Sequence, residues 1–136
     1  MSEKRTLLED ELFKIVHEPD SGLVIFVRKS RPLPVGTAAE LALQAVDRIL
    51  AAFDPRTTPL LFDMREAPLR SEEAYQQTVK EARLRVEARF HNTCVLVKTA
   101  VGKLQVTRFA REEGRAPAVF MNETEARAYL LAPNKS

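Results

Sequence analysis

Short apolar runs alternate with amphipathic stretches along this chain, and the two patterns predict strands and helices in turn. Residues 12–17 and 23–27 are β-prone runs on either side of a cluster of turn formers at 18–22, which predicts a β-hairpin. The second run is apolar without interruption. We therefore expect the second strand to be buried on both faces of a sheet, with the first strand at or near its edge.

The rest of the chain repeats a strand followed by a helix. Short apolar runs predict strands at residues 60–63, 94–97 and 118–121. Apolar side chains at helical spacing, with capping residues before them, predict helices at residues 37–53, 71–90, 99–113 and 122–131. Strands that are each followed by a helix pair in parallel through right-handed crossovers. The predicted fold class is therefore α/β, a single domain with a mixed five-stranded sheet and four helices.

The domain is expected to span residues 11–132. Residues 1–10 are a candidate flexible N-terminus, and residues 133–136 form a C-terminal tail. In the third predicted helix, Val101, Leu104 and Val106 are apolar positions that we expect to face the core, together with Phe109. Gly102 in the same helix is expected to allow a close approach to the sheet. The surrounding residues do not make a phosphate-binding P-loop, because the first glycine and the hydroxyl after the lysine are missing.

Composition supports one ordinary folded domain and excludes several kinds of site. The chain has 136 residues, of which 45% are apolar and 29% are charged. One cysteine and two histidines are too few for a disulfide framework or a cysteine-rich zinc site, so no metal or cofactor is expected. No apolar run approaches the roughly 18 residues of a membrane span. We therefore predict a cytoplasmic protein.

The formal net charge of +2 conceals an uneven distribution along the chain. Residues 80–111 hold eight basic and two acidic residues, whereas residues 1–66 hold nine basic and eleven acidic ones. A basic half of this kind fits either a solvated helix face or a surface that binds an acidic protein or an anion. Nucleic-acid binding is not favoured, because the chain has no Trp and Phe90 and Phe109 fall on positions expected to face the core.

The order of elements resembles the STAS or SpoIIAA-like family, the fold of bacterial anti-sigma-factor antagonists. The residues that carry the resemblance are the hairpin around Gly22, the strand that ends in Asp63, the strand at 95–97 and the closing strand and helix at 119–130. The resemblance covers roughly residues 11–131 as a pattern of hydrophobicity and order. It implies a regulatory module that works by protein–protein contact, and the architecture is related to that of lipid-carrying domains.

One departure separates this chain from the antagonists of that family. In them, a serine phosphorylated by an anti-sigma kinase follows the aspartate at the strand end, whereas here Asp63 is followed by Met64, Arg65 and Glu66. The resemblance therefore points to a divergent branch that lacks the phosphorylatable serine. Ser71 lies further on, where it fits an N-cap and, as an alternative, a phosphorylation site.

Asp63 and Arg65 form the first group of candidate site residues. In open α/β sheets, ligands bind in the crevice beyond the carboxyl ends of the strands, and Asp63 ends a predicted strand. In a structural role, Asp63 would cap the following loop and pair with a neighbouring arginine. In a functional role, Asp63 and Arg65 would form a polar recognition patch with Arg89 or Lys98. No second carboxylate completes an acid/base pair, so we predict no catalytic residues.

The second group consists of basic side chains at the candidate partner- or anion-binding positions, which are Lys80, Arg83, Arg89, Lys98 and Lys103. Lys98 and Lys103 flank the start of the third predicted helix, where free N–H groups attract anions. The single thiol, Cys94, lies within an apolar run and is expected to be a buried hydrophobe. His17 and His91 are expected to be structural or solvated.

The leading functional hypothesis is a non-enzymatic, STAS-like regulatory module. It would act by protein–protein contact, either with an acidic partner or as a homodimer. A domain that binds a small ligand, a lipid or a nucleotide, is the alternative, and an enzyme acting at Asp63 and Arg65 is a third hypothesis.

Overall fold

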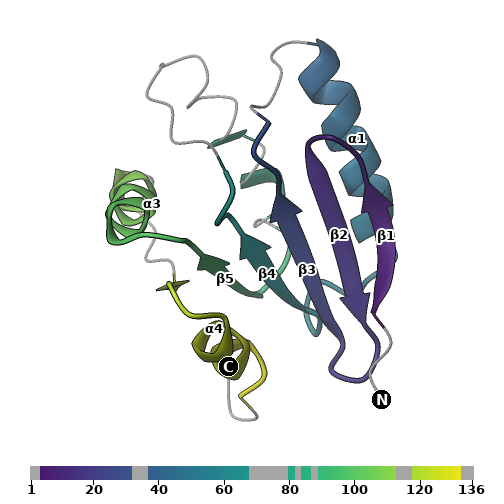
Figure 1. Ribbon diagram of the computed structural model, residues 1–136. Coiled ribbons are helices and arrows are strands. Elements are labelled where there is room, and N and C mark those ends of the chain that lie inside the picture. Colours follow the sequence, from purple (N-terminus) through teal and green to yellow (C-terminus); the bar gives the residue numbers. More distant parts are fainter. Residues whose placement is uncertain are drawn as a thin grey trace.

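The computed structural model describes residues 4–31, 37–67, 80–81, 84–86, 89–112 and 118–132. In these residues the chain forms one six-stranded mixed sheet with helices on both of its faces (Figure 1). The strands are β1 (Arg5–Glu9), β2 (Phe13–Glu18), β3 (Leu23–Arg28), β4 (Pro59–Asp63), β5 (Asn92–Leu96) and β6 (Val119–Phe120). The helices are α1 (Thr37–Leu50), α3 (Ala100–Glu112) and α4 (Glu123–Leu130).

Part of the helix predicted for residues 71–90 is also described. Residues 80–81 and 84–86 are helical, in agreement with that prediction, whereas residues 71–79 lie outside the described part of the chain. Ser71 belongs to the latter group, so its two alternatives stay predictions.

The predicted hairpin is confirmed in β2 and β3. The two strands pair in antiparallel register from Phe13 opposite Arg28 to Glu18 opposite Leu23. Gly22 closes the turn with a φ of 77°, a value that L side chains rarely adopt, and its N–H donates to the carbonyl of Glu18 over 2.8 Å. The turn formers at 18–22 therefore mark the end of one strand and the start of the next.

The prediction of five strands is wrong, because residues 5–9 form an additional strand, β1, against β2. The register of this pair shifts between Thr6 and Leu8, where the strand has an irregularity of the bulge type. As a result Leu7 and Leu8 both pack against the core, and the alternation that identifies a strand is lost. Residues 5–9 thus belong to the sheet, although they were predicted to lie outside the domain.

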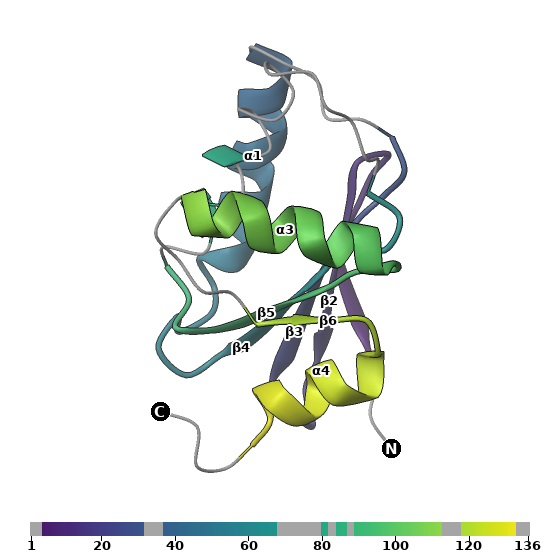
Figure 2. The same cartoon turned by 90° about the vertical axis from the view of Figure 1, so that its left-hand side faces the viewer.

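The strands stand in the sheet in the order in which they occur in the chain, β1-β2-β3-β4-β5-β6. From β3 onward each strand pairs in parallel with the next. Right-handed crossovers that always advance in the same direction place their helices on the same face of the sheet. Figure 2 shows this arrangement, with α1 and α3 on one face and α4 on the other.

The two faces of the sheet carry separate apolar clusters. On the α1 face, Phe13, Phe26 and Phe62 pack with Val46 and Leu50 of α1. On the α4 face, the buried set is smaller and comprises Val16, Leu23, Ile25, Leu61, Cys94, Leu96, Ala126 and Leu130. Strands β2 to β5 contribute to both clusters, and β3 and β4 stand at the middle of the strand order, so β3 is buried on both faces as the apolar run at 23–27 predicted.

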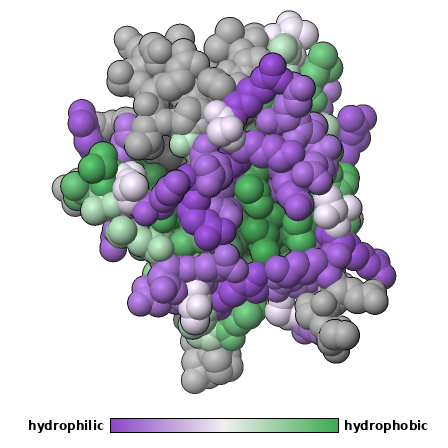
Figure 3. Space-filling model, in the orientation of Figure 1, coloured by the Kyte–Doolittle hydropathy of each residue, from purple (hydrophilic) through white to green (hydrophobic). Residues whose placement is uncertain are grey.

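On its face of the sheet, α4 packs on β4, β5 and β6. Strands β2 and β3 lie beside it, and Figure 3 shows apolar side chains of this face between hydrophilic ones. The ligand crevice of an open α/β sheet forms where the strand order reverses. The order of the described strands never reverses, so this sheet has no such switch point. Among the described residues, no helix has the length and apolar character needed to cross a membrane.

Candidate functional site

Asp63, at the carboxyl end of β4, is tied to Arg65 by three hydrogen bonds. The backbone N–H of Arg65 donates to Asp63 Oδ1 over 3.1 Å, and the guanidinium donates through Nε to Oδ1 over 2.9 Å and through Nη2 to Oδ2 over 2.7 Å. The Asp63 residue is only 8% exposed. The carboxylate therefore caps the loop after β4 and pairs with its neighbouring arginine, which is the structural role considered for it above.

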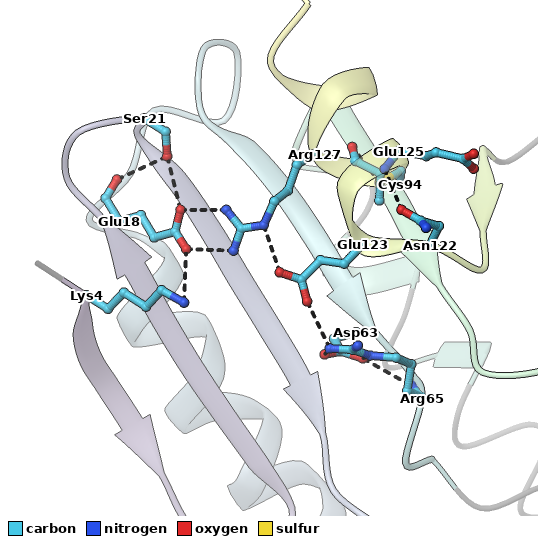
Figure 4. Close-up of polar contacts among 11 residues, drawn as sticks. Lys4, Glu18, Ser21, Asp63, Arg65, Cys94, Asn122, Glu123, Glu125 and Arg127 are labelled. Atoms are coloured by element: carbon cyan, nitrogen blue, oxygen red, sulfur yellow. Dashed lines mark hydrogen bonds and ion pairs between the residues drawn. The ribbon is translucent and has the colours of Figure 1, made fainter. Parts of the chain in front are cut away.

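This pair is one end of a longer row of charges, drawn in Figure 4, that we call the ion-pair ladder. Its five members are Asp63, Arg65, Glu123, Arg127 and Glu18. Arg65 Nη2 lies 3.2 Å from Glu123 Oε1, and Arg127 Nε donates to Glu123 Oε2 over 2.8 Å. Arg127 also donates through Nη1 and Nη2 to the two oxygens of Glu18, over 2.8 and 2.7 Å. Negative and positive side chains alternate along the ladder, which joins β2, β4 and α4.

Glu18 is the most deeply placed carboxylate of the ladder, with a side chain that is 6% exposed. The hydrogen bonds from Arg127 hold its pKa below the ordinary value of a glutamate, against the opposing effect of burial, and Lys4 adds a weaker attraction. Ser21 Oγ donates to Glu18 Oε1 over 3.4 Å. The same pairing raises the pKa of the Arg127 guanidinium. Glu18 and Arg127 therefore stay ionised at neutral pH.

The N-terminus of α4 places Glu123 in the ladder. Asn122 is the N-cap of this helix, at the start of the helix predicted for residues 122–131, and its Oδ1 accepts a hydrogen bond from the N–H of Glu125 over 3.0 Å. Glu123 thus lies in the first turn, where the helix dipole favours a negative charge, and Arg127 follows it by one helical turn.

Three members of the ladder, Glu18, Glu123 and Arg127, were not predicted as site residues. The spacing of Glu123 and Arg127 by four positions is a signal in the sequence for a pair on one helix face. No comparable signal links Glu18 with Arg127, because the two residues are 109 positions apart in the chain. The contact forms because Glu18, at the end of β2, lies on the face of the sheet that α4 covers.

The geometry of the ladder favours anchoring over catalysis. A general acid or base must present a carboxyl group to a substrate, but the Asp63 carboxylate accepts three hydrogen bonds from Arg65 and the Glu18 carboxylate accepts two from Arg127. The ladder instead fixes α4 to the sheet with charge-assisted, bidentate bonds.

Arg89, predicted to share a patch with Asp63, instead lies beside α1. Its Nη1 lies 3.9 Å from Oδ1 of Asp47, and Arg85 donates to the same carboxylate and to Glu40. Both arginines therefore neutralise acids of α1. Lys80 is exposed on the partly described helix, and Arg83 lies outside the described residues.

Lys98 and Lys103 are exposed at the start of α3 and form no ion pair within the described part of the chain. Thr99 caps this helix, since its Oγ1 accepts a hydrogen bond from the N–H of Gly102 over 3.0 Å. The cap occupies one of the N–H groups that could have bound an anion.

The expectation for the faces of α3 is wrong at two positions. Val101 and Leu104 point to solvent and are 66% and 71% exposed, although they were predicted to face the core. The inward face carries Gly102, which is buried, and the partly buried Val106. A Cβ atom at Gly102 would lie 3.3 Å from Oγ1 of the capping Thr99 and 3.6 Å from Cβ of Val97, so α3 lies in van der Waals contact with the residue that follows β5.

The remaining candidates take structural positions. Cys94 is 2% exposed, and its thiol lies 3.8 Å from the carbonyl oxygen of Ala126 in α4, as expected for a buried small side chain. The ring of His17 packs edge-on against Phe53 at 4.9 Å between centroids. Among the described residues, no group of three or more potential ligands could hold a metal ion.

Comparison with known proteins adds no relative: no family model, no curated protein and no solved structure matches this chain.

Proposed function

We propose that this domain is a non-enzymatic, STAS-like regulatory module of the cytoplasm that binds an acidic protein partner through its basic half. One observation carries the proposal. Lys98 and Lys103 are exposed side by side with apolar side chains of α3, and no described acid neutralises them. An uncompensated basic surface attracts acidic partners and accelerates their encounter.

Several other described arginines are already paired with acids, which supports Lys98 and Lys103 as the binding surface. The guanidinium groups of Arg65, Arg85 and Arg127 are engaged by acids of the chain itself. Because Asp63 is held by Arg65, the strand end that was considered as an enzyme site presents a neutralised pair. The binding hypothesis is therefore better supported than the catalytic one.

The STAS-like part of the proposal is supported by the order of elements. An antiparallel hairpin is followed by parallel strands with intervening helices, as the resemblance implies. Arg65 occupies the loop in which the antagonists of that family carry their phosphorylated serine, and it is bonded to Asp63. We therefore propose a module whose partner binding does not depend on a phosphoserine at that loop.

Charge reversal tests the proposed function. The variant Lys98→Glu with Lys103→Glu is compared with a control that reverses two exposed basic residues elsewhere, Arg5→Glu with Arg48→Glu. Tagged proteins are expressed in the native host, and partners are quantified by mass spectrometry at low and high salt. We expect one acidic protein to bind the native chain and the control, to be lost from the Lys98/Lys103 variant, and to dissociate at high salt.

Two results would overturn the proposed function. The first is that no protein is enriched and light scattering shows a monomer at all concentrations. The second is a partner whose binding is the same in both variants. Self-association that depends on Lys98 and Lys103 would support the homodimer alternative in place of an acidic partner.

A further inference from the structure

The outer side of α3 is the most exposed apolar surface of the described chain. Val101 and Leu104 are 66% and 71% exposed, which exceeds the exposure of every other large apolar side chain described. Their spacing of three positions places them on one face of the helix, and Arg108 continues the same stripe one turn later. Gly102 and Val106 on the opposite face make the contacts with the sheet, so Val101 and Leu104 point away from the described core.

A further exposed apolar side chain, Met121, directly follows β6, the strand that α3 contacts. Leu96 of β5 pairs with Phe120 of β6, so Met121 lies level with the start of the connection to α3. Met121 is 48% exposed. Figure 2 shows α3 lying across this edge of the sheet with β6 beside it, and the two elements are in contact. We call Val101, Leu104 and Met121, with Lys98 and Lys103, the α3 outer surface.

The charge of this surface limits what can cover it. Lys98 lies just before α3, Lys103 adjoins Leu104 in the sequence, both are exposed, and α3 has no acidic residue in its first turn. A complementary occupant needs apolar side chains to cover Val101 and Leu104, with carboxylates at its margin to meet the lysines. A second basic surface of the same kind would be repelled.

The shape of the surface favours a helix as the occupant. An extended peptide adds to a sheet through a row of backbone hydrogen bonds, but β6 offers an edge of only two residues. In contrast, α3 has 13 residues and is therefore about 20 Å long, which is sufficient for a second helix to pack along its outer stripe. An anionic membrane is less suitable, because the stripe has two apolar side chains and no aromatic anchor.

We propose that the α3 outer surface is the docking site for an amphipathic helix of another protein, with apolar residues three or four positions apart and acidic residues beside them. This inference rests on the proposed function. It specifies where the partner binds and which side chains the partner presents. The small apolar area predicts a transient complex with salt-dependent binding.

Photo-crosslinking in the native host tests the site. A photoreactive phenylalanine analogue replaces Val101 in one protein and, as a matched control, Leu41 of α1 in another, since Leu41 is also exposed, at 61%. The crosslinked peptides are sequenced by mass spectrometry. We expect the probe at 101 to capture one protein segment with the acidic, amphipathic pattern, and the probe at 41 to capture none.

A second substitution checks that the apolar stripe contributes to binding. With the probe at 101, Leu104→Ser should reduce the crosslinked yield about ten-fold, as expected for a side chain at the centre of an interface, whereas Leu41→Ser should leave it unchanged. Both serine variants should melt at the temperature of the native chain, because both side chains are exposed. Equal yields from the two variants would refute the docking site.

The outcomes separate the inference from the proposed function. If only the probe at 41 captures a partner, the domain still acts as an interaction module, but the α3 outer surface is not its binding site. Capture of lipid, of nucleic acid, of a second copy of the chain or of a segment without acidic residues at 101 would overturn the inference. If neither probe captures a partner and charge reversal at Lys98 and Lys103 has no effect on binding, both the docking site and the proposed function are overturned.

Discussion

Arg127 links α4 to strand β2 through its side chain. Its guanidinium donates to two carboxylates, through Nε to Glu123 and through both terminal nitrogens to Glu18. A lysine would supply the charge but not the planar fork that meets two acceptors at once. The rigid arrangement of these donors explains why an arginine, and not another cation, fits this position of α4.

Replacing Arg127 by Met should destabilise the domain by about 2 kcal/mol, because Glu18 would remain buried without its main partner. The double variant Arg127→Met with Glu18→Gln should recover part of that loss. Urea denaturation followed by circular dichroism measures both. A single variant as stable as the native chain would show that the ladder contributes nothing to folding.

Residue-scale roles were predictable only where the partners are close in sequence. The pairing of Asp63 with Arg65 could be anticipated, because a strand-ending aspartate and an arginine two positions later form a local loop motif. Glu18 was assigned only to a turn. Its partner, Arg127, lies on the last described helix, and no sequence pattern indicates that the two residues meet in the fold.

At the scale of elements, α3 turns the face that carries its glycine, and not its exposed apolar pair, toward the sheet. Val101 with Leu104 and Gly102 with Val106 are two sets at helical spacing on different sides of the same helix. Hydrophobicity alone favours the first set. The structure instead turns the second set inward, with Gly102 buried against Val97, the residue after β5, and Val106 packed on the core.

Gly102→Leu should therefore lower the free energy of unfolding by roughly 1–3 kcal/mol, because the added side chain pushes α3 away from Val97. Lys103→Leu is the matched control, since the same side chain placed at the neighbouring exposed position should change stability by no more than about 0.5 kcal/mol. Thermal unfolding of the two variants under identical conditions measures the difference. Equal melting temperatures would mean that this close approach is not required.

Strand β1 was not predicted, because its apolar residues do not alternate regularly. A strand is recognised from alternation with a period of two, and the irregularity between Thr6 and Leu8 places Leu7 and Leu8 against the same core. The remaining strands follow their apolar runs closely, because each is short, buried and bounded by turn formers or by a helix cap.

For the whole molecule, the lowered pKa of Glu18 makes stability depend on pH. A carboxyl group with a lower pKa in the folded state binds fewer protons there than in the unfolded state. Its stabilising contribution is therefore complete above the ordinary glutamate pKa of about 4.3 and is lost as the pH falls through the lower, folded value.

Acidification from neutral pH to below that range should reduce the melting temperature of the native chain more than that of Glu18→Gln. At neutral pH the variant should be the less stable of the two, because it has lost the ionic bond with Arg127. Calorimetry across the pH range measures both curves. Parallel curves would show that Glu18 has the same pKa in both states.

The overall class, α/β with one mixed sheet, could be predicted because strand and helix patterns alternate clearly along the chain. The site could not be predicted to the same extent. The crevice argument for Asp63 assumes a sheet whose strand order reverses, and the sequential order of these strands removes that condition. Strand order depends on contacts between distant segments, which hydrophobic periodicity does not report.

The sequential order of the sheet also bears on how the chain can assemble during synthesis. The first three strands form an antiparallel unit from neighbouring segments, and every later strand joins the free edge left by the one before it. None of the described strands has to insert between two that are already paired. The sheet can therefore grow in one direction as residues leave the ribosome, and α4, which comes last, covers the second face only when the sheet beneath it is complete.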